Sequence, residues 1–148
     1  LHVRIALTKG QFSKYILRKA KELGLLPGQP HILEYLETND GCSQSEICEA
    51  WDLDKSTVSG LAERMERDGL IFVEKEEKDR RRKKLFLTPK GRELCGRMNQ
   101  YMTQLDQMAF EGIPKEEQAQ FMKTLLQIYN NLKEAEKNGK EQAKTDFI

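Results

Sequence analysis

The amino-acid sequence predicts a mainly α fold that contains one small β-hairpin. Three observations support this prediction. Apolar residues recur every three or four positions along most of the chain, helix-capping residues begin several of these stretches, and strand-like composition occurs only at 71–73 and 85–87. The chain has 148 residues, about the length of one domain, so we expect a single domain over 1–148.

The first two helices are predicted from apolar spacing and from the residues that end them. Residues 4–23 carry an apolar stripe with helical spacing, formed by Phe12, Ile16, Ala20 and Leu23. Gly24 ends this stretch. Pro30 suits the first turn of a second helix over about 30–37, and Asn39-Asp40-Gly41 forms the turn that follows.

Two shorter helices follow, each with an N-terminal cap. Ser43 and Glu46 have the spacing of a capping box. We expect the helix after them to place three residues on one side: Ile47, Ala50 and Trp51. Asp54 is a strong N-cap candidate for the fourth helix. Its predicted buried stripe has clear helical spacing and consists of Val58, Leu61, Ala62 and Met65. Gly69 suits the left-handed backbone that ends this helix.

The remaining elements are a hairpin and two long helices. The strands 71–73 and 85–87 enclose a charged tract that is too polar to be core. Thr88 and Pro89 then provide the cap and first position of a fifth helix. Gly112 breaks this helix and Pro114 begins a sixth, which we expect to fray from Asn138 onward.

This order predicts a winged helix-turn-helix over residues 27–91, because two helices joined by a tight turn precede a basic hairpin. The flanking helices, 1–24 and 92–137, carry more apolar surface than one small winged domain can cover. We therefore expect them to form a dimer interface; the alternative is that they pack only within their own subunit.

Charge is concentrated in the hairpin. The whole chain has a net charge of +1, whereas residues 54–91 hold 11 basic and 8 acidic residues, a net +3. Six of the seven residues from Lys78 to Lys84 are Lys or Arg. These cations repel one another in a free protein, and the phosphates of duplex DNA would relieve that repulsion. The alternative is a solvated loop.

The fourth helix offers a second DNA-binding surface. Its exposed face begins with short polar residues and glycine, as expected where a recognition helix enters the major groove. The predicted contacts are Lys55, Ser56, Thr57, Ser59, Gly60 and Arg64. Backbone N–H groups at this end could hold a phosphate. Gly60 costs on the order of 1 kcal/mol against alanine in mid-helix, which close packing on DNA or on a neighbouring helix would offset.

Other classes of function lack support in the sequence. Cys42, Cys48 and Cys95 have no metal-ligand spacing, and such a sparse, odd set is typical of a reducing cytoplasm. We find no membrane span, secretory signal, Gly-rich phosphate loop, Ser elbow or HExxH motif. The sequence therefore predicts a cytoplasmic protein that is not an enzyme and needs no cofactor or metal.

The hairpin also carries a family signature. Asp79-Arg80-Arg81, followed after five residues by Leu87-Thr88-Pro89-Lys90-Gly91, resembles the wing signature of the MarR (multiple antibiotic resistance) family of winged helix-turn-helix transcriptional regulators. Residues 54–58 and 66–70 resemble the recognition helix of that family and its exit. The resemblance covers nearly the whole chain.

This resemblance implies a homodimer that binds a pseudo-palindromic operator on double-stranded DNA. It implies that Asp79 pairs with Arg81 to stiffen the wing and that Arg80 or Arg81 reaches the minor groove, within the basic tract that includes Lys78 and Arg82. Ser43 and Gln44 would touch phosphate. Most members of the family are repressors released by small, often phenolic, ligands bound between the DNA-binding and dimer regions.

Three alternatives remain open from the sequence. The protein could sense oxidants through a thiol, although the cysteine found in the first helix of such family members is missing here. It could use its winged domain for protein contact without DNA, or bind DNA without any effector. His31 and Tyr35 are candidates to border a ligand cleft, although we favour a packing role for both.

Overall fold

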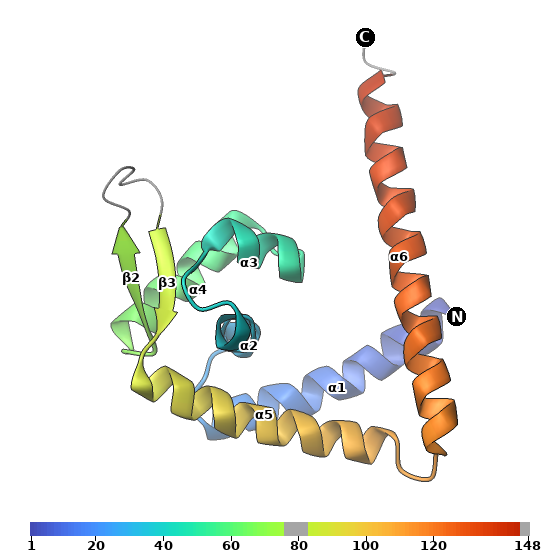
Figure 1. The fold of residues 1–148 in the computed structure, drawn as a ribbon, viewed down its shortest axis with the longest axis horizontal. Coiled ribbons are helices and arrows are strands. Elements are labelled where there is room, and N and C mark those ends of the chain that lie inside the picture. Colours follow the sequence, from blue (N-terminus) through green and yellow to red (C-terminus); the bar gives the residue numbers. More distant parts are fainter. Residues whose placement is uncertain (76–82, 146–148) are drawn as a thin grey trace. The chain divides into compact units, whose positions relative to one another are not determined.

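The computed structural model describes the backbone of residues 1–75 and 83–145, with side chains up to residue 138. The chain forms two compact units, Leu1–Asp106 and Gln107–Ile148, and each is described by itself. The element order follows the sequence prediction, with one additional short strand (Figure 1). The elements are α1 (His2–Glu22), α2 (Gln29–Thr38), β1 (Cys42–Ser43), α3 (Gln44–Trp51), α4 (Lys55–Arg67), β2 (Ile71–Lys75), β3 (Lys83–Leu87), α5 (Pro89–Ala109) and α6 (Lys115–Thr145).

The sheet of the first unit has three antiparallel strands in the order β1-β3-β2. In the hairpin, Ile71 pairs with Leu87 and Val73 pairs with Leu85. Cys42 of β1 pairs with Leu85 from the other side. The sequence analysis did not predict β1, because two residues are too few to show a period and their pairing depends on a distant strand.

The core of the first unit lies where α2, α3 and α4 pack against the hairpin. The predicted stripe of α4 is buried, together with Ile32, Leu33, Leu36, Ile47, Ile71 and Leu85. Each large apolar side chain buried in this way contributes roughly 1.5–3 kcal/mol to stability. Within this unit α2 lies between α3 and α5 (Figure 1). Cys95 and Asn99 of α5 form hydrogen bonds with α2.

One predicted face is wrong. Ala50 is exposed and Trp51 is half-buried, whereas Ile47 is fully buried. The reason is that α3 has only two turns and contacts the core mainly through Ile47. Trp51, at the end of α3, stacks its ring on His31 at a centroid distance of 4.2 Å.

The predicted caps are confirmed. The Ser43 N–H donates to Glu46 Oε2 at 2.7 Å, and the Glu46 N–H donates to Ser43 Oγ at 3.3 Å, which completes the capping box. Asp54 caps α4. Gly69 has a φ of 70° after α4, the left-handed conformation that favours glycine.

The start of α5 is fixed against the base of the hairpin. Thr88 Oγ1 accepts a hydrogen bond from the Gly91 N–H at 3.0 Å and lies 2.7 Å from the Gly69 carbonyl oxygen, to which it donates. Gly91 passes so close to Leu70 that an added Cβ would lie 2.0 Å from the Leu70 carbonyl oxygen. Only glycine therefore fits at this position without a backbone shift.

The second unit consists of the end of α5, a turn at Gly112 and α6. Phe110 and Phe121 pack edge-to-face within it, with ring centroids 6.1 Å apart. The backbone of α6 is helical to Thr145, so the predicted fraying from Asn138 is wrong. Most residues from 138 to 145 are Lys, Glu, Gln or Ala, which favour helix. Among the described residues, no helix combines the length and apolar character that crossing a membrane requires.

Candidate nucleic-acid interface

The N-terminal half of α4 presents an exposed polar face. Lys55, Ser56 and Thr57 are exposed, and so is Arg64 one to two turns later. Ser59 and Gly60 are half-buried on the same helix. Because the opposite stripe is buried in the core, the orientation of α4 is fixed and its polar side points away from the protein. The structure thus places six of the predicted contact residues together on one helix.

Asp54 holds the first turn of α4. Its Oδ1 accepts from the Thr57 N–H at 2.8 Å and from Ser56 Oγ at 2.5 Å, and its Oδ2 accepts from Thr57 Oγ1 at 2.5 Å. These hydrogen bonds, from Ser56 first and then from Thr57, hold the pKa of Asp54 well below its usual range. The carboxylate therefore stays ionised and already satisfies an N–H group that we expected to hold a phosphate.

Gly60 faces open space. An added Cβ would meet no described atom within 4 Å. Packing on a neighbouring helix, one of the two explanations considered for this glycine, is therefore wrong for the described part of the chain. The cost of a mid-helix glycine, on the order of 1 kcal/mol against alanine, is not offset by contacts within the protein.

The Ser43 hydroxyl already has a partner within α3, and its phosphate contact stays a prediction. The hydroxyl donates to Glu46 Oε2 at 2.8 Å, so it cannot donate to a phosphate at the same time. The Ser43 N–H and hydroxyl lower the pKa of Glu46, which keeps a negative charge at this end of α3. Gln44 is half-buried, and its phosphate contact stays a prediction.

The wing is described only up to its tip. Phe72 and Phe86 stack across the β2–β3 pair at a centroid distance of 5.2 Å. The predicted groove residues lie outside the described residues: Lys78, Asp79, Arg80, Arg81 and Arg82. The proposed Asp79–Arg81 pair and the groove arginine therefore stay predictions.

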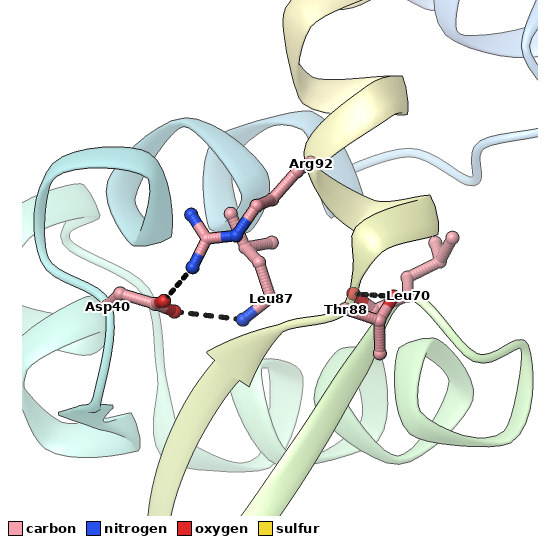
Figure 2. A network of polar contacts seen from close by, with 5 residues as sticks. All are labelled: Asp40, Leu70, Leu87, Thr88 and Arg92. Atoms are coloured by element: carbon pink, nitrogen blue, oxygen red, sulfur yellow. Dashed lines mark hydrogen bonds and ion pairs between the residues drawn. The ribbon is translucent and has the colours of Figure 1, made fainter.

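Asp40 anchors the base of the wing, a role that the sequence analysis missed. Figure 2 shows its carboxylate between two partners: Oδ1 accepts from the Leu87 N–H at 2.8 Å, and Oδ2 forms an ion pair with Arg92. The turn before β1 is thereby tied to both β3 and α5. These partners lie 47 and 52 residues away in sequence, and the only signal available was the turn-forming Asn39-Asp40-Gly41.

Two of the three cysteines, Cys42 and Cys95, do not have the environment of reactive thiols. Cys42 and Cys95 are buried, and burial raises the pKa of each thiol to about 11. Cys95 Sγ also donates to the Leu33 carbonyl at 3.4 Å. Both thiols therefore remain protonated near neutral pH, whereas reactive cysteines carry lowered pKa values. These surroundings disfavour the thiol-sensing alternative for the two cysteines.

A cleft lies between α1, the start of α2 and the turn that joins α3 to α4. Its volume is about 630 Å³, and its wall includes Lys9, Phe12, His31, Trp51 and Leu53. His31 therefore borders a cleft, although the sequence analysis favoured a packing role for it. Tyr35 is instead half-buried against the hydrophobic core.

The cleft wall contains buried polar atoms. His31 Nδ1 and Trp51 Nε1 are buried and have no hydrogen-bond partner among the described residues. Burial lowers the pKa of His31, so its ring is neutral near pH 7. An apolar cleft with a few polar atoms is the usual composition of a small-molecule site.

Comparison with known proteins connects this geometry to a family. The MarR family model matches residues 23–82. A candidate transcriptional regulatory protein for the hcr operon of Thauera aromatica is 30% identical over 118 residues, 80% of this chain and 71% of the relative.

Two solved structures bound to DNA have the same fold. The S. aureus MepR–DNA complex has a TM-score of 0.80 at 25% identity, covering 88% of this chain and 96% of MepR. A candidate MarR family regulator from Listeria monocytogenes, complexed with 26mer DNA, has a TM-score of 0.85 at 23% identity, covering 89% of this chain and 88% of that one.

The matched family consists of transcriptional regulators rather than enzymes. Its winged helix-turn-helix is the arrangement that α3, α4 and the β2–β3 hairpin form here. The chain therefore belongs to the MarR family of transcriptional regulators.

Proposed function

We propose that this regulator is a cytoplasmic homodimer that represses transcription by binding a pseudo-palindromic operator and is released by a small aromatic ligand. In this proposal each subunit places α4 in the major groove and its wing beside the minor groove. The observation that carries it is the exposed polar face of α4 at Lys55, Ser56 and Thr57, on a helix whose opposite side is buried in the core.

DNA binding is supported by rigidity as well as by charge. The wing base is held by Asp40, and the first turn of α4 is held by Asp54. A site held in this way loses little conformational freedom on binding. Gly60 lies on α4 with no described atom near its missing Cβ, which leaves room for close approach of the DNA backbone.

A homodimer is supported by the apolar surface of both units. In the first unit, α1 exposes Leu1, Val3, Ile5, Leu7 and Leu17. In the second, α6 exposes Phe121, Met122, Leu125, Leu126, Tyr129 and Leu132. On α6 these side chains recur at helical spacing, and apolar surface gathered in this way marks an interaction site on a soluble protein. Two-fold symmetry would place the two recognition helices about one duplex turn, roughly 34 Å, apart.

Ligand control is supported by the cleft. Its volume of about 630 Å³ suits a small molecule. Phe12, His31 and Trp51 offer aromatic rings, and Lys9 offers a cation for an acidic group. Asp52 and Leu53, which also line the cleft, directly precede the cap of α4. A ligand there would touch the turn that sets the position of the recognition helix.

Selection of DNA from a random pool tests the central proposal. We expect enriched sequences to contain inverted half-sites about one turn apart and binding to weaken steeply with salt. Arg81→Ala should weaken binding to the selected site by at least about 1 kcal/mol. A monomeric sample that binds no duplex in dilute salt would contradict the proposal and favour a protein-contact module instead.

A thermal-shift panel of aromatic acids tests the effector. A ligand that binds only the folded protein raises its melting temperature. The same compound should release the operator, and His31→Ala should weaken both effects. If no compound shifts the melting temperature or releases DNA, a regulator without an effector is the better description.

A further inference from the structure

The first turn of α4 contains a hydrogen-bond arrangement that bears on base selection. We propose that Asp54 makes Ser56 and Thr57 hydrogen-bond acceptors toward the major groove, so that each contacts the exocyclic amino group of an adenine or a cytosine and not the acceptor atoms of guanine or thymine. This inference rests on the proposed function in which α4 enters that groove, and it names the base chemistry that the helix recognises there.

The positions of the two hydroxyl protons follow from the carboxylate beside them. A serine or threonine hydroxyl has one proton to donate and two lone pairs that accept. Ser56 Oγ lies 2.5 Å from Asp54 Oδ1, and Thr57 Oγ1 lies 2.5 Å from Asp54 Oδ2. An ionised carboxylate only accepts. Both protons therefore point at Asp54, and each hydroxyl has only lone pairs left for a further partner.

These two hydrogen bonds should persist when DNA binds. Hydrogen bonds from a hydroxyl to a carboxylate are short and about twice as strong as bonds between neutral groups. Turning either proton toward a base would exchange the stronger bond for a weaker one. The same carboxylate also holds the Thr57 N–H at 2.8 Å, which fixes its position relative to the helix.

The major groove offers few partners to an acceptor. Hydrogen-bond donors there are the N6 amino group of adenine and the N4 amino group of cytosine, whereas guanine and thymine edges present acceptors. A free serine or threonine can pair with either kind. With Asp54 in place, Ser56 and Thr57 are matched to amino groups and mismatched to O6, N7 and O4.

The first experiment combines base and protein substitutions. Half-sites are selected with the wild-type protein and with Ser56→Ala and Thr57→Val, which remove one hydroxyl each. Positions whose preference is lost in a variant are the ones that hydroxyl contacts. Each base pair carries one amino group in the major groove, on its adenine or its cytosine, and we expect the hydroxyl to contact that group. Replacing that adenine by purine, or that cytosine by 2-pyrimidinone, removes only the amino group and should weaken wild-type binding about five-fold, the factor for one net hydrogen bond.

The same base replacement should have little effect on the variant that lacks the matching hydroxyl, because the contact is already lost. Thr57→Ser keeps the hydroxyl and should restore the wild-type sensitivity to the base. This pairing separates a direct contact from a change in helix stability, which would weaken binding to both duplexes equally.

Asp54→Asn tests the role of the carboxylate. The asparagine oxygen can still cap α4, but its NH₂ group donates, so one hydroxyl must turn its proton outward. We expect base pairs that turn guanine O6 or thymine O4 toward that hydroxyl to become acceptable at one of the two positions, with a change of about five-fold in relative affinity. Asp68→Asn is the matched control, because it removes the same charge at the other end of α4 and should leave base preference unchanged.

Each outcome decides between the two claims. If no variant and no wild-type protein binds duplex DNA, the proposed function fails and the inference fails with it. If the protein binds its selected site but Ser56→Ala and Thr57→Val alter no base preference, or if removing the amino group leaves wild-type binding unchanged, only the inference is overturned. Unchanged preference in Asp54→Asn, with a folded protein by circular dichroism, also overturns it.

Discussion

Replacing Gly91 with alanine should destabilise the protein, although the same change usually stabilises a helix. The added Cβ would lie 2.0 Å from the Leu70 carbonyl oxygen and 3.3 Å from Leu87 Cδ2. An ordinary contact begins near 3.4 Å, so the start of α5 and the Leu70 backbone must separate by more than an ångström. The shortest contact is with main chain, so a shift of the Leu87 side chain alone cannot relieve it.

The size of this destabilisation follows from the contacts that the added Cβ would disturb. Overpacking of this kind costs about 1–3 kcal/mol. The shift also loosens the hydrogen bond from the Thr88 N–H to the Leu70 carbonyl, 3.1 Å long. It likewise disturbs the bond of the Thr88 hydroxyl, whose one proton is shared between the Gly69 carbonyl at 2.7 Å and the Leu70 carbonyl at 3.1 Å. Each of these bonds contributes about 0.5–1.5 kcal/mol. The gain in helix propensity is at most about 1 kcal/mol. We therefore expect Gly91→Ala to lower the free energy of unfolding by about 2–4 kcal/mol.

Gly96 on the same helix provides the matched control. It is exposed, and an added Cβ would meet no described atom within 4 Å. Gly96→Ala should therefore stabilise the protein by up to about 1 kcal/mol. Urea denaturation of both variants at one protein concentration compares the two signs. Equal effects, or a Gly91→Ala variant as stable as wild type, would refute the close approach of α5 to Leu70.

Three further predictions concern other positions. Gly60→Ala should raise the free energy of unfolding by about 0.5–1 kcal/mol and weaken operator binding. Calorimetry measures the change in stability, and fluorescence anisotropy measures the change in affinity. An unchanged affinity for the operator would rule out close DNA contact at Gly60. Burial lowers the pKa of His31, so the unfolded chain takes up a proton first and stability should fall as pH drops below about 6.5. His31→Gln should reduce that decline in the melting temperature between pH 7.5 and 5.5, and an identical decline would exclude His31 as a cause. Asp40→Ala leaves the Leu87 N–H without its acceptor, so it should lower the free energy of unfolding by about 1–3 kcal/mol and weaken DNA binding. Asp40→Asn keeps an acceptor and should lower the free energy of unfolding by less. Equal losses of stability in the two variants would show that the hydrogen bond to Leu87 is unimportant.

Much of the fold could be predicted because its signals are local. The capping box of Ser43 and Glu46, the cap at Asp54 and the buried stripe of α4 all depend on residues three to seven positions apart. The candidate site on α4 was predicted for the same reason, since the buried stripe defines which side remains exposed. The prediction failed at Ala50, which is exposed, whereas Cys48 and Trp51 of the same two-turn helix pack against the core beside Ile47.

The hydrogen bonds within the site could not be predicted from the sequence. Sequence spacing placed Ser56 and Thr57 on the exposed face, but it did not show that one carboxylate receives both hydroxyl protons. Likewise, His31 was a candidate for a cleft, but only packing of α1 against the turn between α3 and α4 forms one. Distances between side chains decide both features, and a pattern of residue types does not contain them.

The sequence by itself determined where helices begin and end, which stripe of α4 is buried and that a basic hairpin follows it, because these features arise from short-range backbone hydrogen bonds and periodic burial. Tertiary structure alone decided that Asp40 reaches Leu87 and Arg92, that β1 joins β3, and that Gly91 must make room for Leu70. Those contacts join residues about 20 to 50 positions apart. Their formation depends on how the whole core packs, and no local pattern records it.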